Sequence, residues 1–223
     1  NPKPENGDPL VDKSGTADRS GGPEIIPGFN FEGLHDPSGI YPPDPTGDIG
    51  KNHYVQMVNT SNGSWFQVWD KESGNSVYGP ALTSTIWSEV GSGSIGDPII
   101  QYDHAAERWL MLELQGFNSN ELLVAISEDS DPTGGWTVYR MQTLGFPDYP
   151  KLYVWNNAYF ITINELVGGN KCSGYALERD AMLAAEPVFD SYRFEMPNFL
   201  AIQFQPATGA DWEGGPPPPP GSP

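Results

Sequence analysis

The chain has 223 residues, of which 37% are hydrophobic and 12% aromatic, and it contains 26 Gly and 23 Pro. Its formal net charge of −18 excludes a phosphate backbone or an anionic lipid surface as a natural partner, so we expect neither nucleic-acid binding nor membrane insertion. No apolar run approaches the roughly 18 residues that cross a bilayer. Cys172 is the single cysteine, which excludes an internal disulfide and a cysteine-based zinc cluster.

The N-terminal segment, residues 1–22, is polar and rich in Pro, Gly and Asp. Such a composition buries too little apolar surface to offset the entropy of ordering, so we expect an extended arm or linker. The first residue is Asn1 rather than Met, as in a processed secretory protein. The sequence therefore favours a secreted or cell-surface location.

The region 23–213 repeats itself about every fifty residues. Three units, 41–87, 96–143 and 146–196, each hold about four short segments rich in Val, Ile, Tyr, Phe and Trp, separated by turn formers. A fourth unit is expected to start at Asn198. The expected strands include 53–59, 64–70 and 76–82, then 99–103, 108–114, 121–127 and 136–142, and finally 151–155, 158–164, 172–178 and 191–196.

Four antiparallel strands per repeat predict an all-β fold, a β-propeller with four-stranded blades. A β-sandwich is the alternative, but it does not explain the regular return of Asp before an apolar strand. Closed propellers have typically four to eight blades. We therefore expect this chain to cover only the N-terminal blades, and expect the remainder of the propeller, a C-terminal continuation or a second chain, as a partner.

Two further segments complete the chain. Good helix formers over residues 176–186 predict one short helix between blade strands. Residues 214–223 contain five consecutive prolines, which favour an extended polyproline II conformation. We expect a loop or a cleavage segment there.

An aspartate recurs at the start of each unit, as Asp48, Asp97 and Asp148. The first strand of every propeller blade lines the central channel, so these carboxylates should converge, and they repel one another unless they bind a cation, become protonated or cap amides. Calcium prefers oxygen ligands, so the three residues are candidate metal ligands with calcium as the expected cofactor. An Asx-type cap of each local turn is the competing interpretation. The further candidate ligands are Asp44, Asp129 and Asp131.

The segment SEDSDPTGGW, residues 127–136, resembles a degenerate Asp box, the hairpin motif of sialidase-like propellers. The resemblance implies that Asp129 or Asp131 stabilises the turn and that Trp136 lies in the core. We expect Trp69 and Trp109 in the core as well.

Several segments together resemble the blade motifs of large secreted bacterial propeller proteins, many of which are exported by the type IX pathway of Bacteroidota. They are PPDPTGDIGKNHYVQMVN, GDPIIQYDHAAERWLM, SEDSDPTGGW and FPDYPKLYVW. The resemblance covers about residues 27–223 and implies export and a multi-blade propeller. It transfers no active site.

These observations favour a non-catalytic binding or assembly module, with glycans or surface proteins as partners and calcium as a stabiliser. The alternative is a carbohydrate-active hydrolase, sialidase-like or of another glycosidase type. A sialidase-like site needs an arginine cluster, yet the five arginines do not recur at matched positions, and the three histidines lack close metal-ligand spacing. No catalytic residue is identified. The residues concerned are Arg19, Arg108, Arg140, Arg179 and Arg193, with His35, His53 and His104.

Overall fold

The computed structural model describes residues 30–36, 38–91, 93–167 and 170–195. The expected arm, the fourth unit from Asn198 and the proline-rich segment lie outside the described residues. All elements below belong to the compact unit Phe31–Pro223.

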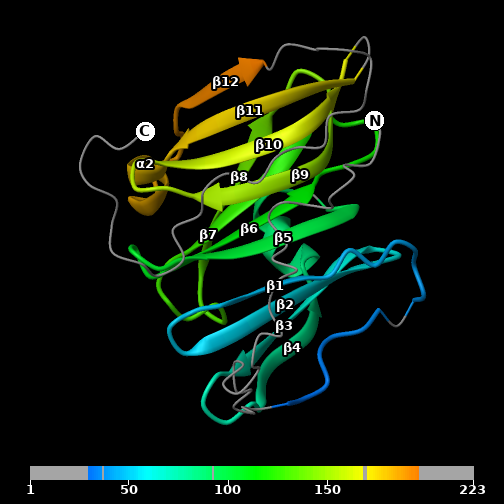
Figure 1. The fold of residues 1–223 in the computed structure, drawn as a ribbon, viewed down its shortest axis with the longest axis vertical. Helices are drawn as coiled ribbons and strands as arrows, with labels where there is room; N and C mark the ends of the chain where they lie inside the picture. Colours follow the sequence, from blue (N-terminus) through cyan, green and yellow to red (C-terminus); the bar gives the residue numbers. More distant parts are fainter. Residues whose placement is uncertain (1–29, 37, 92, 168–169, 196–223) are drawn as a thin grey trace, which may run out of the picture. The chain divides into compact units, whose positions relative to one another are not determined.

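The described residues form three antiparallel sheets of four strands each, and each sheet uses four consecutive strands of the chain (Figure 1). Blade 1 consists of β1 (Thr46–Ile49), β2 (His53–Thr60), β3 (Gly63–Asp70) and β4 (Ser76–Leu82). Blade 2 consists of β5 (Gly96–Asp103), β6 (Arg108–Leu114), β7 (Glu121–Ser127) and β8 (Trp136–Gln142). Blade 3 consists of β9 (Phe146–Val154), β10 (Ala158–Leu166), β11 (Asn170–Glu178) and β12 (Ser191–Glu195).

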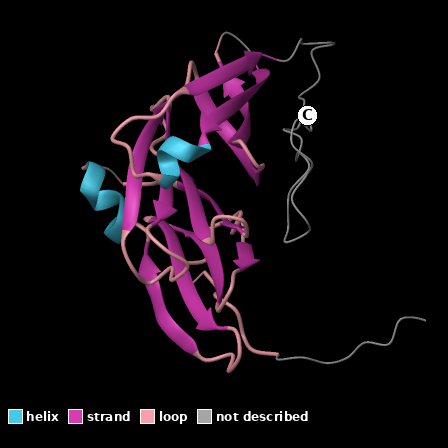
Figure 2. Cartoon of the chain, turned by 90° about the vertical axis from the view of Figure 1, so that its left-hand side faces the viewer, coloured by secondary structure: helices cyan, strands magenta, loops and turns pink. Residues whose placement is uncertain are grey.

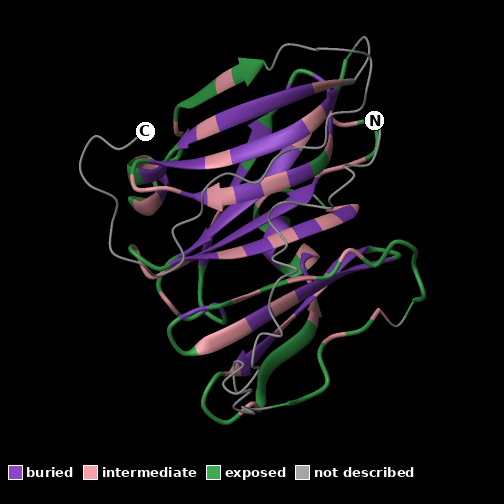
Figure 3. Ribbon diagram, in the orientation of Figure 1, coloured by how far each residue is buried: buried purple, intermediate pink, exposed green. Residues whose placement is uncertain are grey.

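The first strands of the blades are neighbours, since β1 contacts β5 and β5 contacts β9 (Figure 1). The last strands of blades 1 and 3, β4 and β12, are mostly exposed (Figure 3). Successive up-and-down sheets that meet through their first strands are the blades of a β-propeller. The predicted fold class is confirmed, and the repeat of about fifty residues corresponds to one blade.

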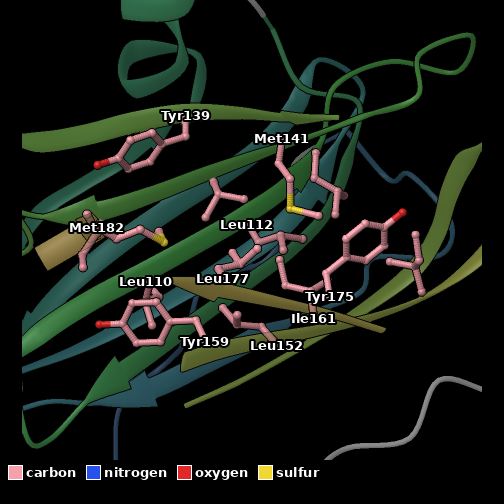
Figure 4. Packing of buried hydrophobic residues seen from close by; sticks show 14 of the residues in the cluster. Leu110, Leu112, Tyr139, Met141, Leu152, Tyr159, Ile161, Tyr175, Leu177 and Met182 are labelled. Carbon is pink, nitrogen blue, oxygen red and sulfur yellow. The ribbon is translucent and has the colours of Figure 1, made fainter. Parts of the chain in front are cut away.

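Blade 2 is buried on both faces because it packs against blade 1 on one face and blade 3 on the other. The side chains of each strand alternate between these two faces. On β6, Leu110 and Leu112 enter the core shared with blade 3, whereas Trp109 and Met111 enter the core shared with blade 1. Figure 4 shows the first of these cores, where Leu152 and Tyr159 of blade 3 lie close to the leucines. Trp69, Trp109 and Trp136 are all buried, as predicted.

The helices are short and lie between strands (Figure 2). They are α1 (Ser84–Trp87), the 3₁₀ turn η1 (Ser88–Val90) and α2 (Arg179–Leu183). The helix predicted over 176–186 is only α2, because residues 176–178 pair with β10 and belong to β11. The first two helical segments were not predicted. Among the described residues, no helix has the length and apolar character needed to cross a membrane.

A buried ion pair connects blades 2 and 3. Asp103, at the end of β5, accepts hydrogen bonds of 2.8 Å from Arg179 Nε and from Tyr159 Oη. Its other oxygen accepts the main-chain N–H groups of Ala105 and Ala106. Since removal of one partner of such a pair leaves an uncompensated buried charge, breaking it costs about 3–5 kcal/mol.

Candidate functional site: the pocket at the blade starts

Each blade starts with the same backbone turn, in which a residue of positive φ precedes a proline. The φ angle is 39° at Asp44, 52° at Asp97 and 51° at Tyr149. This left-handed region is rare for residues with a side chain, and a bulky residue such as Tyr is an outlier there. Strained residues of this kind are concentrated at functional sites. The three dipeptides are Asp44–Pro45, Asp97–Pro98 and Tyr149–Pro150.

These turns line one pocket of about 360 Å³, which we call the blade-start pocket. It is formed by residues 44–46 and 97–99, at the starts of β1 and β5, and by residues 149–152, in the middle of β9. Its prolines, Ile99 and Leu152 provide apolar walls. A pocket with apolar walls and a few convergent polar groups is the usual form of a small-ligand site. The polar side chains with a charge or an aromatic ring are Asp44, Asp97, Tyr149 and Lys151.

Asp97 carries the perturbed carboxyl group of the pocket. Burial raises its pKa, and the negative charges of Asp44 and Asp148 raise it further. Asn59 and Lys151 act in the opposite direction without cancelling the rise. Asp97 therefore holds its proton to a higher pH than an ordinary aspartate, while the neighbouring carboxylates supply negative charge.

Asn59, near the end of β2, links the first two turns. Its Nδ2 donates to Asp44 Oδ2 over 2.9 Å, and its Oδ1 accepts the main-chain N–H of Asp97 over 2.9 Å. The side chain is 8% exposed. Gly96, at φ 115°, permits this approach, because a Cβ there would overlap Asn59 Oδ1. One buried amide thus sets the positions of both aspartates.

Tyr149 and Lys151 form the third side of the pocket. The Lys151 ammonium lies 3.5 Å from the centroid of the Tyr149 ring, and its Nζ donates to Pro150 O over 3.2 Å. The tyrosine is 41% exposed. The pocket therefore combines an accessible aromatic ring with carboxylates and one ammonium group.

Asp44 and Asp97 line the same pocket, and the charges of Asp44 and Asp148 act on Asp97, whereas Asp48 lies elsewhere. Asp48 Oδ2 accepts the main-chain N–H of Tyr102 over 2.7 Å. Tyr102 lies near the end of β5, whereas Asp97 lies near its start. The predicted equivalence of Asp48, Asp97 and Asp148 is wrong, because Asp44 occupies the matching turn of blade 1 and Tyr149 that of blade 3. Asp148 lies directly before Tyr149, opposite Asn164 on β10.

Asp129 and Asp131 lie in the turn between β7 and β8, in blade 2. Asp129 Oδ1 accepts the N–H of Asp131 over 2.7 Å, and Asp131 Oδ1 accepts both N and Oγ1 of Thr133 over 2.9 and 2.7 Å. Trp136 is buried below and donates from Nε1 to Pro132 O. Both local expectations are met, because the aspartates accept hydrogen bonds within the turn and Trp136 is buried.

Within the described ranges, no group of three or more His, Cys, Asp or Glu side chains is arranged to hold a metal ion. Three carboxylates, those of Asp44, Asp97 and Asp148, nevertheless interact electrostatically at the pocket. Calcium binding stays a prediction for this cluster and for Asp48, Asp129 and Asp131.

The described arginines serve structural contacts. Arg108 donates to two main-chain carbonyl groups. Although burial alone would raise the pKa of Glu165, hydrogen bonds from Arg193, Tyr175 and Ser173 lower it to about 2. None of the four described arginines lines the blade-start pocket. The ion pairs are Arg140–Glu121, Arg179–Asp103 and Arg193–Glu165.

Sequence reasoning missed Tyr149 and Lys151, which line the pocket, and Asn59, which hydrogen-bonds to two of its turns. The sequence does contain an indication of Tyr149, because a proline follows the turn residue in all three blades. The prediction compared the positions of the aspartates and not those of the prolines. Asn59 had no periodic signal, since its role depends on contact between two blades.

No protein-family model matches the chain, and a search of curated proteins gives no match. One solved structure with a similar fold is described as a GH43 β-1,3-galactosidase, with a TM-score of 0.41 and 15% sequence identity. The aligned region covers 65% of this chain and 34% of that one. The assignment of propeller blades therefore rests on the sheet topology described above.

Proposed function

We propose that this chain belongs to a secreted or cell-surface β-propeller that acts as a non-catalytic binding module, with the blade-start pocket as its ligand site. The observation that carries the proposal is the convergence of three strained turns on one pocket. Holding Asp97 and Tyr149 at positive φ costs energy. Such strain is retained where the position of a side chain matters for function.

The charge of the pocket favours a neutral or cationic ligand. Asp44 and Asp97 are the carboxyl groups in the pocket lining, the negative charge of Asp148 also acts on Asp97, and the chain as a whole carries a charge of −18. An anionic ligand would be repelled by the carboxylates at the pocket and by the net negative charge of the whole chain. An exposed Tyr149 ring beside hydrogen-bonding carboxyl groups suits a neutral sugar, whose apolar face stacks on an aromatic ring.

A glycan array tests the proposal, with wild type compared with Tyr149→Ala and Asp97→Asn. We expect selective binding of neutral glycans by the wild type, and a loss of about tenfold or more in affinity for each variant. Glu72→Gln is the matched control, since Glu72 is an exposed carboxylate in the β3–β4 turn, outside the pocket lining. Equal binding by all four proteins would remove the pocket as the ligand site.

The second candidate function is a carbohydrate-active hydrolase. The raised pKa of Asp97 beside the negative charge of Asp44 favours it, because a general acid that stays protonated and a neighbouring carboxylate are the two groups of most glycosidases. A hydrolysis screen on the bound glycans separates the two functions. Release of sugar products that Asp97→Asn abolishes would replace the non-catalytic proposal.

A further inference from the structure

The outer edge of blade 2 is an open and regular strand edge. In the described part of the chain, β8 is the last strand of its sheet and has only β7 beside it. All seven of its residues pair with β7 without irregularity, from Trp136 with Ser127 to Gln142 with Glu121. Its outer row of N–H and C=O groups is therefore in the geometry that a further strand would need.

The corresponding edges of the other blades carry features that block strand addition. The pairing of β4 is irregular at two places, and its sequence includes Pro80. The edge strand β12 has only five residues and exposes charged groups such as Glu195. Prolines, bulges, charges and short length are the usual protections of an edge. β8 contains no proline, and its single charged residue, Arg140, is paired with Glu121 at 2.5 Å.

A groove of about 400 Å³ runs along this edge, and we call it the β8 groove. It is lined by five consecutive residues of β8, 138–142. Since consecutive strand residues point to opposite faces, a groove that touches all five follows the backbone edge. Tyr139 and Met141 point into the core shared with blade 3 (Figure 4), so their backbone is what the groove exposes.

Apolar residues form walls on both sides of the groove. Val90, at the end of η1, packs with the core between blades 1 and 2. On the opposite face, Phe189 packs against Tyr139 with ring centroids 4.9 Å apart, and Val188 is 78% exposed. A strand placed in the groove would direct its side chains alternately toward these two walls.

Carboxylates flank both walls. Glu89 precedes Val90, and Glu186 and Asp190 stand on either side of the segment 187–189. All three are exposed. Residues adjacent in sequence to both walls of the groove therefore carry negative charge, which complements Lys or Arg in a bound segment.

We propose that the β8 groove binds an extended peptide of a partner protein, with about five apolar or β-prone residues flanked by basic ones, as a fifth strand of blade 2. Among the described residues the outer edge of β8 has no partner strand, which favours an extended conformation. The two apolar walls favour apolar central residues, and the carboxylates of Glu89, Glu186 and Asp190 favour basic ones beside them. This inference does not depend on the ligand of the blade-start pocket.

Fluorescence anisotropy tests the proposal with a labelled peptide, Lys-Lys-Val-Thr-Val-Phe-Val-Lys-Lys, in about 0.15 M salt. Two further peptides carry N-methyl groups on alternate central residues, one on the Val set and one on the Thr and Phe set. Only alternate N–H groups of an added strand face its neighbour. We expect one methylated peptide to bind about tenfold or more weakly and the other to bind like the parent.

Val188→Lys should weaken binding of the parent peptide, because it adds positive charge to an exposed apolar wall. Val77→Lys is the matched control, since Val77 is 50% exposed on the edge strand β4. Thermal melting of both variants checks that they remain folded. The proposal is overturned by equal effects of the two methylations, by equal effects of the two substitutions, or by no binding up to about 1 mM. Dimerisation of the purified chain that Val188→Lys abolishes would overturn it in favour of a second copy as the occupant.

Discussion

Glu113 on β6 places a fully buried carboxyl group against blade 1. Trp87 donates its indole N–H to Glu113 Oε2, but Glu113 Oε1 and Ser64 Oγ have no hydrogen-bond partner among the described residues. Burial raises the pKa of Glu113, and the nearby hydroxyl groups of Ser64, Thr83 and Ser94 oppose the rise only in part. A neutral carboxylic acid satisfies this site better than a carboxylate, because its O–H can donate to Ser64.

The raised pKa of Glu113 makes stability depend on pH. The folded state keeps a proton that the unfolded state loses above a pKa of about 4.3, so stability falls as pH rises toward the folded-state pKa. Glu113 alone gives at most about 1.4 kcal/mol per pH unit. We expect Glu113→Gln, which is neutral and retains a donor, to lose this part of the slope. Urea unfolding of both proteins at several pH values measures it, and identical slopes would contradict the prediction.

At the level of single elements, the β7–β8 turn shows how polar side chains stabilise a hairpin. Two hydrogen bonds from Thr133 end on the same oxygen of Asp131. Burial alone would raise the pKa of Asp131, but these hydrogen bonds and the charge of His53 lower it. The ionised carboxylate is therefore the form that braces the turn above Trp136.

Asp131→Ala should lower the free energy of unfolding by about 1 kcal/mol at neutral pH, because both hydrogen bonds to Thr133 are lost. Asp131→Asn keeps an acceptor oxygen and should lose less. Since the pKa of Asp131 is lowered, the wild type loses this contribution as pH falls through that pKa, and the difference between wild type and Asp131→Ala should shrink in acid. Thermal denaturation at neutral and acid pH measures the effect. A constant difference would mean that ionisation of Asp131 does not matter.

The sequence predicted most strands within one or two residues, because apolar alternation and turn formers are local signals. It extended the helix around α2 too far. Residues 176–178 have helix-forming side chains, yet Ala176 pairs with Phe160 and Glu178 pairs with Ala158. Tertiary pairing overrides helix propensity at such a position. The segment of α1 and η1 has only seven residues and no clear periodicity, so it was missed.

For the whole molecule, the sequence predicted one equivalent aspartate at the start of each blade, but of the three residues selected only Asp97 occupies the repeated turn. Asp44 lies just before β1 and Asp48 lies within it, and the charge pattern cannot distinguish them. The backbone angles show that the repeated feature is a residue of positive φ followed by proline, and that residue is Asp in two blades and Tyr149 in the third. Contacts between blades, such as those of Asn59, depend on how the sheets pack against each other. They do not recur at a fixed spacing in the sequence, so the repeat does not predict them.

Calcium should stabilise the molecule if the carboxylates of Asp44, Asp97 and Asp148 share it, because a bound cation relieves their repulsion. A ligand that binds only the folded state adds about 2.7 kcal/mol at a hundredfold excess over Kd. We expect calcium to raise the melting temperature, chelation to reverse the change, and Asp97→Asn to reduce it. Sodium chloride at equal ionic strength is the control, since screening of the −18 charge also stabilises. Equal shifts with both salts would refute a specific site.

The ion pair between Asp103 and Arg179 joins residues 76 positions apart, and this separation has a consequence for folding. Blade hairpins close locally, so during synthesis blade 2 can form before Arg179 has left the ribosome. Until then, Asp103 carries an unpaired, hydrated charge on the apolar face that blade 3 will cover. A charge at that place discourages the incomplete face from associating with other nascent chains. The carboxylate of Asp103 thus joins two blades in the native protein, and it opposes aggregation while only blade 2 has folded.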